Sequence, residues 1–341
     1  MKLHEDKTLF REAIEAAAQH HKLRPVFIEK DYWVTYVLRN LGLSKYADTV
    51  IFKGGTSLSK GYHCIDRFSE DIDLAILSPG NYTGNHLKNL LKEITEAITR
   101  HLHIIEGHPE EKKMGRMRAT VYAYDRVIDS GDFGVVKDYV LIEINCFADP
   151  VPYNVVPISS YIAQFFIQTG NEQLIEQYGL TPTRINVLSL ERTFFEKVLS
   201  LNRLSYKGKE ALKEKIRHFY DLHQLFHYPL LAGRLLEPVN YPILINILKN
   251  DHDNKAMHGS WQGQRIQDSP LFTQLETQWK DLAPTYLAGL ETLVWTGQLP
   301  SPESILTVLQ ATRTFVMAFD EKHPPTRSDF PQTITSPLSN S

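Results

Sequence analysis

The segment from residue 50 to residue 77 constrains the fold of this chain most strongly. An apolar run at 50–52 ends in a Gly-Gly pair, and residues 71–77 alternate polar with apolar side chains, as a half-buried strand does. Between these runs, Thr56 and Ser57 stand where the first turn of a short helix is expected. The segment therefore predicts two strands separated by a turn of helix.

Helical periodicity dominates on both sides of this segment. Amphipathic patterns occur at 8–20, 27–41 and 84–100, and further strands are expected at 117–124 and 138–147. Beyond residue 188 strand patterns fade, and helices are expected at 190–204, 210–227, 241–249, 271–295 and 302–319. The sequence thus predicts an α+β fold followed by a helical bundle.

This change of pattern also suggests a domain organisation. We expect one domain at 1–187 and a helical domain at 188–321. Residues 322–341 contain several prolines and few apolar side chains, so we expect a mobile tail there.

Composition excludes several classes of protein. With 37 Lys and Arg against 40 Asp and Glu, the net charge is −3, so no overall positive field marks a nucleic-acid or membrane-surface binder. The two cysteines, Cys64 and Cys146, form neither a zinc motif nor a disulfide framework. The first residues contain neither a signal peptide nor an apolar run of about 18 residues. We expect a cytoplasmic protein.

The turn after the first strand has the character of a phosphate site. Gly54 and Gly55 let the backbone approach a bound group, and Thr56 and Ser57 add hydroxyls beside the free N–H groups of a helix start. The spacing differs from that of a Walker A loop.

Three acidic residues lie on strands that flank this turn. Asp71 and Asp73 are two positions apart on one strand, so their carboxylates project from one face with Cα atoms roughly 6.5 to 7 Å apart. Glu143 is the one acid in a later apolar strand, on the face opposite Ile142 and Ile144. Such carboxylates suit Mg²⁺, and two ions can steady the attacking and leaving oxygens of phosphoryl transfer. Taken alone, a DxD pair is more often a solvated or turn-capping feature.

Two residues of the helical half have open interpretations. Lys197 lies at the margin of an apolar stripe, where it can reach a ligand or simply extend to solvent. Asp221 can belong to a site or form an internal helix pair with Arg217. His223 and His227 share a helix face, but without the glutamate of a zinc-protease motif they favour a surface pair over zinc.

Taken together, these residues resemble the nucleotidyltransferase superfamily, and more closely the AbiEii/AbiGii toxin family of type IV toxin–antitoxin and abortive-infection systems. The pattern is a Gly-Gly helix start, DxD about a dozen residues later and a third acid on a later strand. The matching stretches are 28–35 (IEKDYWVT), 53–58 (KGGTSL), 67–74 (RFSEDIDL), 191–197 (ERTFFEK) and 217–222 (RHFYDL).

The resemblance implies a nucleotidyltransferase-like mixed β-sheet with flanking helices in the N-terminal domain. It further implies that Asp71 and Asp73 hold Mg²⁺, with Glu143 on the strand of the third acid. By the same resemblance, Thr56 or Ser57 of the Gly54-Gly55 turn contacts the triphosphate, Lys197 faces the nucleotide, and Asp221 completes the site.

The resemblance also implies a function: transfer of a nucleotide from an NTP to an RNA acceptor such as tRNA, restrained by a cognate antitoxin. A protein or small-molecule hydroxyl is an alternative acceptor, and an inactive partner-binding relative is a third possibility. Six basic side chains against two acidic ones at 203–218 favour RNA. Intact Asp71 and Asp73 argue against an inactive relative.

Overall fold

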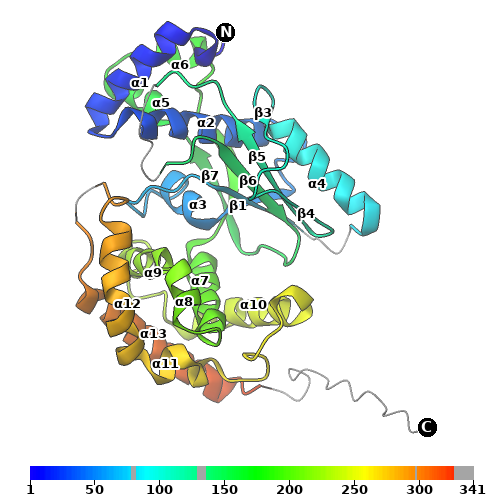
Figure 1. The fold of residues 1–341 in the computed structure, drawn as a ribbon, viewed down its shortest axis with the longest axis vertical. Helices are drawn as coiled ribbons and strands as arrows, with labels where there is room; N and C mark the ends of the chain where they lie inside the picture. The colour runs from blue at the N-terminus through cyan, green and yellow to red at the C-terminus, as the bar shows by residue number, and fades with distance from the viewer. Residues whose placement is uncertain (78–81, 129–135, 296–297, 326–341) are drawn as a thin grey trace. The chain divides into compact units, whose positions relative to one another are not determined.

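The computed structural model describes residues 1–77, 82–128, 136–295 and 298–325 of the chain (Figure 1). The chain divides into two compact units. The first comprises Met1–Thr193 and Leu290–Leu299, and the second comprises Phe194–Gly289 and Pro300–Ser341. In the part of the chain that is described, no helix is both long and apolar enough to cross a membrane.

The first unit is organised around a mixed β-sheet. Its strand order is β3-β5-β6-β2-β1-β8-β7, with β4 paired to β5 at one side. The pairs β2·β6 and β1·β8 are parallel, and the others are antiparallel. The strands are β1 (Val50–Lys53), β2 (Ile72–Ile76), β3 (His103–Ile104), β4 (Lys112–Met114), β5 (Met117–Ala123), β6 (Val140–Asn145), β7 (Tyr153–Ile158) and β8 (Thr183–Leu188).

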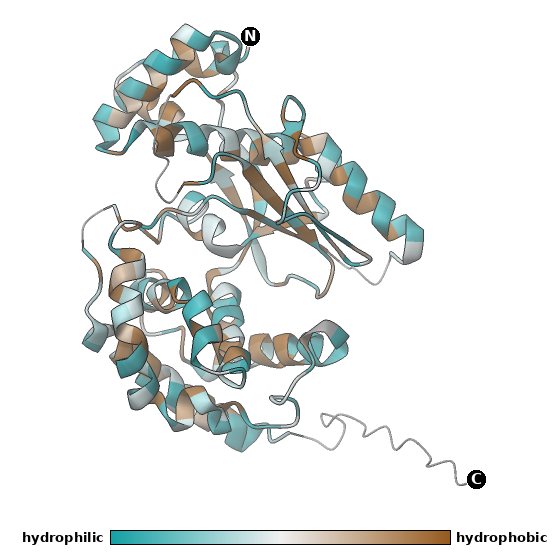
Figure 2. Cartoon of the chain, in the orientation of Figure 1, coloured by the Kyte–Doolittle hydropathy of each residue, from teal (hydrophilic) through white to brown (hydrophobic). Residues whose placement is uncertain are grey.

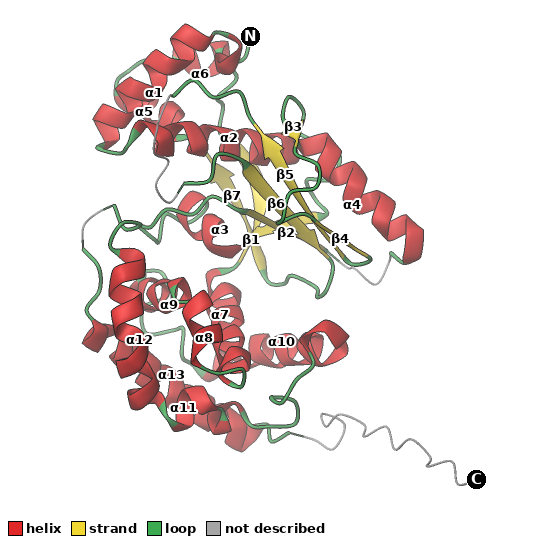
Figure 3. Ribbon diagram, viewed as in Figure 1, coloured by secondary structure: helices red, strands yellow, loops and turns green. Residues whose placement is uncertain are grey.

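Helices cover one face of this sheet (Figure 3). Phe52, Leu74 and Ile142 point from successive strands into the main core, where they meet apolar side chains of the helices. Burial of this apolar surface is the main force that holds the layers together. The helices are α1 (Lys7–His21), α2 (Pro25–Gly42), α3 (Gly54–Lys60), α4 (Gly84–Ile98), α5 (Tyr161–Gln168) and α6 (Gln173–Gln177).

The second unit is helical. Helix α7 begins at the end of the first unit, and an aromatic core that includes Phe195, Phe219, Phe315 and Trp279 lies inside the second. Figure 2 shows hydrophobic and hydrophilic residues mixed along these helices, as expected for amphipathic elements. The helices are α7 (Leu190–Ser205), α8 (Lys209–Glu214), α9 (Arg217–His227), α10 (Tyr241–Asp253), α11 (Pro270–Thr273), α12 (Leu275–Leu290) and α13 (Pro302–Lys322).

The predicted fold class is confirmed: a mixed sheet with flanking helices, followed by helices. Several details differ. The strands β3, β4, β7 and β8 and the helices α5 and α6 were not expected. In β7, most side chains are exposed and give no alternating pattern. The helix expected at 210–227 is divided between α8 and α9, and that expected at 271–295 is divided between α11 and α12.

The expected domain boundary followed residue 187, whereas the compact units divide at Thr193 and return Leu290–Leu299 to the first unit. That return arises from hydrogen bonds between chain segments far apart in sequence. Phe68 donates to the carbonyl of Leu293, and Trp295 donates to that of Asp66. Of the expected tail, residues 326–341 lie outside the described residues.

Candidate active site

The candidate site lies on the central strands of the sheet. In register, Asp73 of β2 lies between Lys53 of β1 and Glu143 of β6. Side chains at paired positions of neighbouring strands project from the same face. The alternate residues Leu74 and Ile144 belong to the main core. Asp73 and Glu143 therefore share the face of the sheet that is turned away from that core.

Gly54 brings the start of α3 against Asp73. Its φ of +80° is a left-handed conformation that residues with side chains rarely adopt. A Cβ atom here would lie 2.0 Å from Oδ2 of Asp73. At Gly55, a Cβ atom would lie 2.5 Å from Nη2 of Arg67 and 2.9 Å from Oγ of Ser69. Both glycines are thus required by close approach, and the first lies directly against the carboxylate.

The two hydroxyls of this turn have partners within the protein. Ser57 Oγ donates to the carbonyl oxygen of Gly54 at 2.8 Å, and Thr56 Oγ1 lies 3.0 Å from Oγ of Ser69. Both side chains are buried. A phosphate contact by either hydroxyl requires it to exchange its present partner.

Asp71 lies just before β2 and pairs with a lysine that the sequence did not single out. Lys137 Nζ is 3.0 Å from Oδ1 of Asp71 and 3.0 Å from Oε1 of Glu110, and Tyr139 donates a hydrogen bond to the other oxygen of Glu110. Burial lowers the pKa of Lys137, but the two carboxylates outweigh it and raise the pKa above its usual range. The ammonium therefore stays charged beside Asp71.

The buried ion pair of Lys30 and Glu70 holds the backbone of Lys137 in place. Glu70 accepts the backbone N–H of Lys137 at 3.1 Å and lies 3.1 Å from the ammonium of Lys30. Lys30 in turn donates to the carbonyl oxygens of Lys137 and Tyr139. Burial lowers the pKa of Lys30 and raises that of Glu70, while their mutual attraction opposes both shifts. The pair therefore holds the backbone of Lys137 close to Glu70, the residue that precedes Asp71.

Lys30 is the middle of three consecutive charged residues buried in α2. Glu29 accepts the N–H groups of Val127 and Ile128. Asp31 pairs with Lys60 at the end of α3 and accepts the N–H of Tyr161 at 2.8 Å. Each charge thus ties a different segment to α2. A run of three charges within an apolar helix was the sequence signal for this scaffold.

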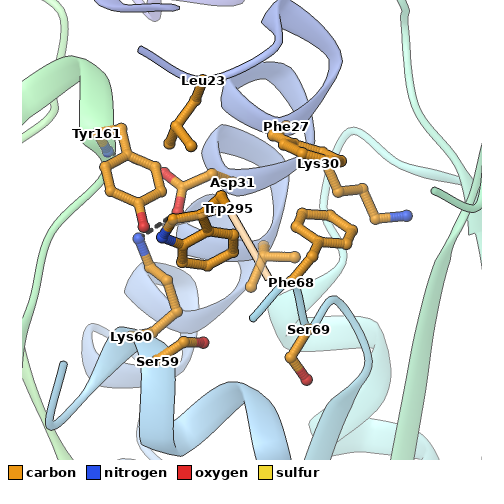
Figure 4. Close-up of a pocket in the computed structure, with 11 residues that line it drawn as sticks. Leu23, Phe27, Lys30, Asp31, Ser59, Lys60, Phe68, Ser69, Tyr161 and Trp295 are labelled. Carbon is orange, nitrogen blue, oxygen red and sulfur yellow. Dashed lines mark hydrogen bonds and ion pairs between the residues drawn. The ribbon is translucent and has the colours of Figure 1, made fainter. Parts of the chain in front are cut away.

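Asp31 and Lys60 border a small cavity of about 20 Å³, enough for one water molecule. Figure 4 shows the Lys60 ammonium directed toward Asp31 and Tyr161, while Lys30 extends away from them. The stacked rings of Phe27 and Phe68, with centroids 4.5 Å apart, form part of the wall. The cavity is too small for a nucleotide, and the Asp31–Lys60 ion pair at its wall joins α2 to α3.

The carboxylate oxygens on the face of the sheet that carries Asp73 and Glu143 are suitable ligands for a magnesium ion. Among the residues that the structure describes, no three or more His, Cys, Asp or Glu side chains converge as a complete metal cage. Mg²⁺ needs only one or two carboxylates when substrate phosphates and waters supply the remaining oxygens. This requirement is met by Asp73 and Glu143 on adjacent strands, together with Asp71 directly before β2.

In the second unit, Lys197 and Asp221 pair with each other. The ammonium of Lys197 on α7 lies 2.8 Å from Oδ2 of Asp221 on α9, and both residues are buried. Lys197 therefore does not extend freely into solvent.

The basic run at 203–218 is partly neutralised by acids that are distant in sequence. Arg203 pairs with Asp251, and Lys209 lies 2.9 Å from Asp281. Lys213 pairs with Glu210 within the run. Counting Asp251 and Asp281 reduces the local excess from four positive charges to two, so the run is a weaker sign of RNA binding than its sequence suggested.

Comparison with known proteins identifies the family of this chain. The profile described as "Nucleotidyl transferase AbiEii toxin, Type IV TA system" matches residues 36–310. Among solved structures, the nucleotidyltransferase toxin MenT4 from Mycobacterium tuberculosis H37Rv is 17% identical, with 91% of this chain and 95% of that chain covered and a TM-score of 0.48. No curated protein matches. Because the family profile spans most of its length, this chain belongs to the AbiEii family of nucleotidyltransferase toxins.

Proposed function

We propose that the chain uses Mg²⁺ to transfer a nucleotide from an NTP to an RNA acceptor, with tRNA as that acceptor, and that a cognate antitoxin restrains it. The observation that carries the proposal is the placement of Asp73 between Lys53 and Glu143, with the glycine turn of α3 against its carboxylate. In such a transfer the acceptor hydroxyl loses its proton to solvent, its oxygen forms a bond to the α-phosphorus, and the bond from that phosphorus to the departing pyrophosphate breaks.

Asp71, Asp73 and Glu143 are the residues that would hold magnesium, as one or two ions. When bound, the ion supplies charge neutralisation at the phosphate oxygens. The carboxylates themselves orient the ion and repel a triphosphate that arrives without it. Gly54 and Gly55 allow the backbone to approach phosphate closely, and Thr56 or Ser57 would contact it after giving up its present hydrogen bond.

Lys197 and Asp221 are proposed to act toward the nucleotide, on the strength of the family resemblance. Their ion pair gives them a structural role as well, because each neutralises the other inside the second unit. The two roles require separate tests.

An RNA acceptor is supported by a second basic cluster, which lies on the same unit as Asp73. Lys112, Lys113 and Arg116 on and beside the β4–β5 hairpin are exposed, and Arg118 follows on β5. Lys113 pairs with Glu111, while Arg116 donates to the carbonyl of Cys146. An exposed cluster of this kind offers a polyanion several phosphate contacts.

The direct test incubates the protein with each labelled NTP and total tRNA. We expect label in tRNA with the wild type, and a loss of at least about a hundredfold with Asp73→Asn, which keeps the size of the side chain but removes its charge. Gln267→Glu, which changes one charge in the second unit, is the control: it shows whether a change of charge outside the proposed metal site lowers activity by itself. Label in protein or in a small molecule instead of RNA would replace the proposed acceptor.

A growth assay tests the toxin role separately. Expression of the wild-type chain alone should slow growth, and Asp73→Asn should not. If both are equally harmless over a range of expression levels, the proposal of a toxic transferase is wrong.

A further inference from the structure

Lys137 contacts a proposed metal ligand without belonging to any motif of the sequence. Its ammonium bridges Asp71 and Glu110 at 3.0 Å each. We infer that Lys137 is a resident counter-cation: it occupies the Asp71 carboxylate in the nucleotide-free protein, yields that carboxylate to the divalent cation, and then pairs with the triphosphate. This inference rests on the proposed function, which places magnesium at Asp71.

The carboxylates at this end of the sheet need a positive charge near them. Asp71 lies directly before β2, two residues ahead of Asp73, and Glu143 lies beside Asp73 in register. Carboxylates gathered in this way repel one another unless a cation lies among them. The Lys137 ammonium supplies that charge at Asp71. An oxygen that accepts a hydrogen bond from an ammonium is less available to a metal ion, so the two cations compete.

The backbone of Lys137 is fixed, whereas its side chain is partly exposed. Its backbone N–H is held by Glu70, and its carbonyl oxygen accepts from Lys30 at 3.0 Å. Both anchoring side chains are buried. The side chain of Lys137, by contrast, is 27% exposed, and that of its partner Asp71 is 39% exposed. The ammonium can therefore change partners while the backbone stays in place.

The ammonium released from Asp71 needs a new anionic partner. A triphosphate bound at Asp71 through a divalent cation brings several negative oxygens to within reach of the same side chain. Lys137 then exchanges one anionic partner for another. Removal of Lys137 should consequently have opposite effects on the two ligands: tighter binding of the metal alone, and weaker binding of the nucleotide in the presence of metal.

The test measures binding, not turnover, on the full chain. Isothermal titration with Mn²⁺ alone, and then with an α,β-methylene NTP analogue at saturating Mn²⁺, is carried out on wild type, Lys137→Met and Lys137→Gln. We expect Mn²⁺ affinity to rise about fivefold and analogue affinity to fall about fivefold in both variants. Two substitutions guard against a folding defect peculiar to one of them, and thermal unfolding identifies either.

The matched control is Lys92→Met, which removes the same charge from a lysine of the first unit that pairs with Glu96 instead. It should change neither affinity by more than about twofold. Unchanged Mn²⁺ affinity in the Lys137 variants, or an equal gain in Lys92→Met, would overturn the inference. Asp71→Asn tests the underlying proposal: if it leaves Mn²⁺ binding intact, the metal is not at Asp71 and the proposed site itself is wrong.

Discussion

The ammonium of Lys197 and the carboxylate of Asp221 lie 2.8 Å apart, joining α7 to α9 within the second unit. Asp221 is completely buried, and the Lys197 side chain is 8% exposed. The sequence offered Asp221 a local partner, Arg217, one helical turn earlier. The pair with Lys197 means that loss of activity after mutation of either residue has two possible causes, a lost nucleotide contact or a destabilised unit.

Lys197→Met should destabilise the second unit by about 3 kcal/mol, because it removes the ammonium that lies 2.8 Å from the buried carboxylate of Asp221. The double variant Lys197→Met/Asp221→Leu should recover most of this loss, since both charges of the buried ion pair are then removed together. Urea unfolding followed by tryptophan fluorescence measures both. The same two proteins then separate the roles: if Lys197 faces the nucleotide, the double variant is stable but inactive. Restored activity in it would leave the pair with a structural role only.

Gly54→Ala should abolish activity at a modest cost in stability. The added Cβ would lie 2.0 Å from Oδ2 of Asp73, so the carboxylate must move. The matched control is Gly170→Ala, where φ is +73° and a Cβ would meet nothing within 4 Å. Both variants share a backbone strain of about 1 to 2 kcal/mol, and the activity assay reports the difference. Equal activity in the two variants would show that Asp73 tolerates displacement.

The sequence predicted the parts of the fold that have strong local patterns. The strand–turn–strand segment at 50–77 and the helices α1, α2, α4, α7 and α13 follow directly from alternation and helical periodicity. β7 did not, because its exposed side chains carry no alternating pattern. The interruption at Lys215 and Ile216 between α8 and α9 escaped for a different reason: neither glycine nor proline marks it.

The candidate site, like the fold, could be predicted only where a local sequence pattern marks its residues. Asp71 and Asp73 could be nominated from their spacing, and Glu143 because it is the one acid in an apolar strand; the register of β2 and β6 then places Asp73 beside Glu143. Lys137 could not, since its importance comes from Glu70 and Lys30, which reach it only in the folded chain. Lys30 lies within a stretch that carried the family resemblance, and the run of charges at 29–31 signals a scaffold, but the partner of Lys30, Glu70, becomes apparent only in the folded chain.

His223 should make the second unit sensitive to acid. Burial first, and then the charge of His227, lower the pKa of His223 to about 4, and its Nε2 lies 2.6 Å from Oγ of Ser304. The unfolded chain binds a proton near pH 6.5, whereas the folded unit resists it. The contribution of this group to stability is therefore complete above pH 6.5 and is lost as the pH falls toward 4.

His223→Gln removes this titration, so its urea midpoint should fall less than that of wild type between about pH 7 and about pH 4.5. His258→Gln, a change at an exposed histidine of the same unit, should leave the wild-type pH dependence in place. Parallel curves for wild type and His223→Gln would mean that other groups govern acid sensitivity.

The pairing of basic residues in the second unit changes where RNA contacts are expected. Lys209 and Lys213 are engaged with Asp281 and Glu210. Reversing their charges places new carboxylates beside those acids, which perturbs the helices as well as any RNA contact. The second basic cluster, on the β4–β5 hairpin, provides a cleaner experiment. Lys112 is exposed, and Arg116 donates a hydrogen bond from one guanidinium nitrogen to the backbone carbonyl of Cys146.

Lys112→Glu/Arg116→Glu should raise the KM for RNA and flatten its salt dependence, with each lost phosphate contact lowering the logarithmic slope by about one. NTP binding should stay unchanged, because neither residue lies on the strands that carry Asp73 and Glu143. The comparison is Lys207→Glu/Lys209→Glu/Lys213→Glu in the run at 203–218. A flattened slope in the hairpin variant alone assigns the acceptor to the first unit. A flattened slope in the triple variant alone assigns it to the second, and the preference for the hairpin that follows from the observed ion pairs would then be wrong.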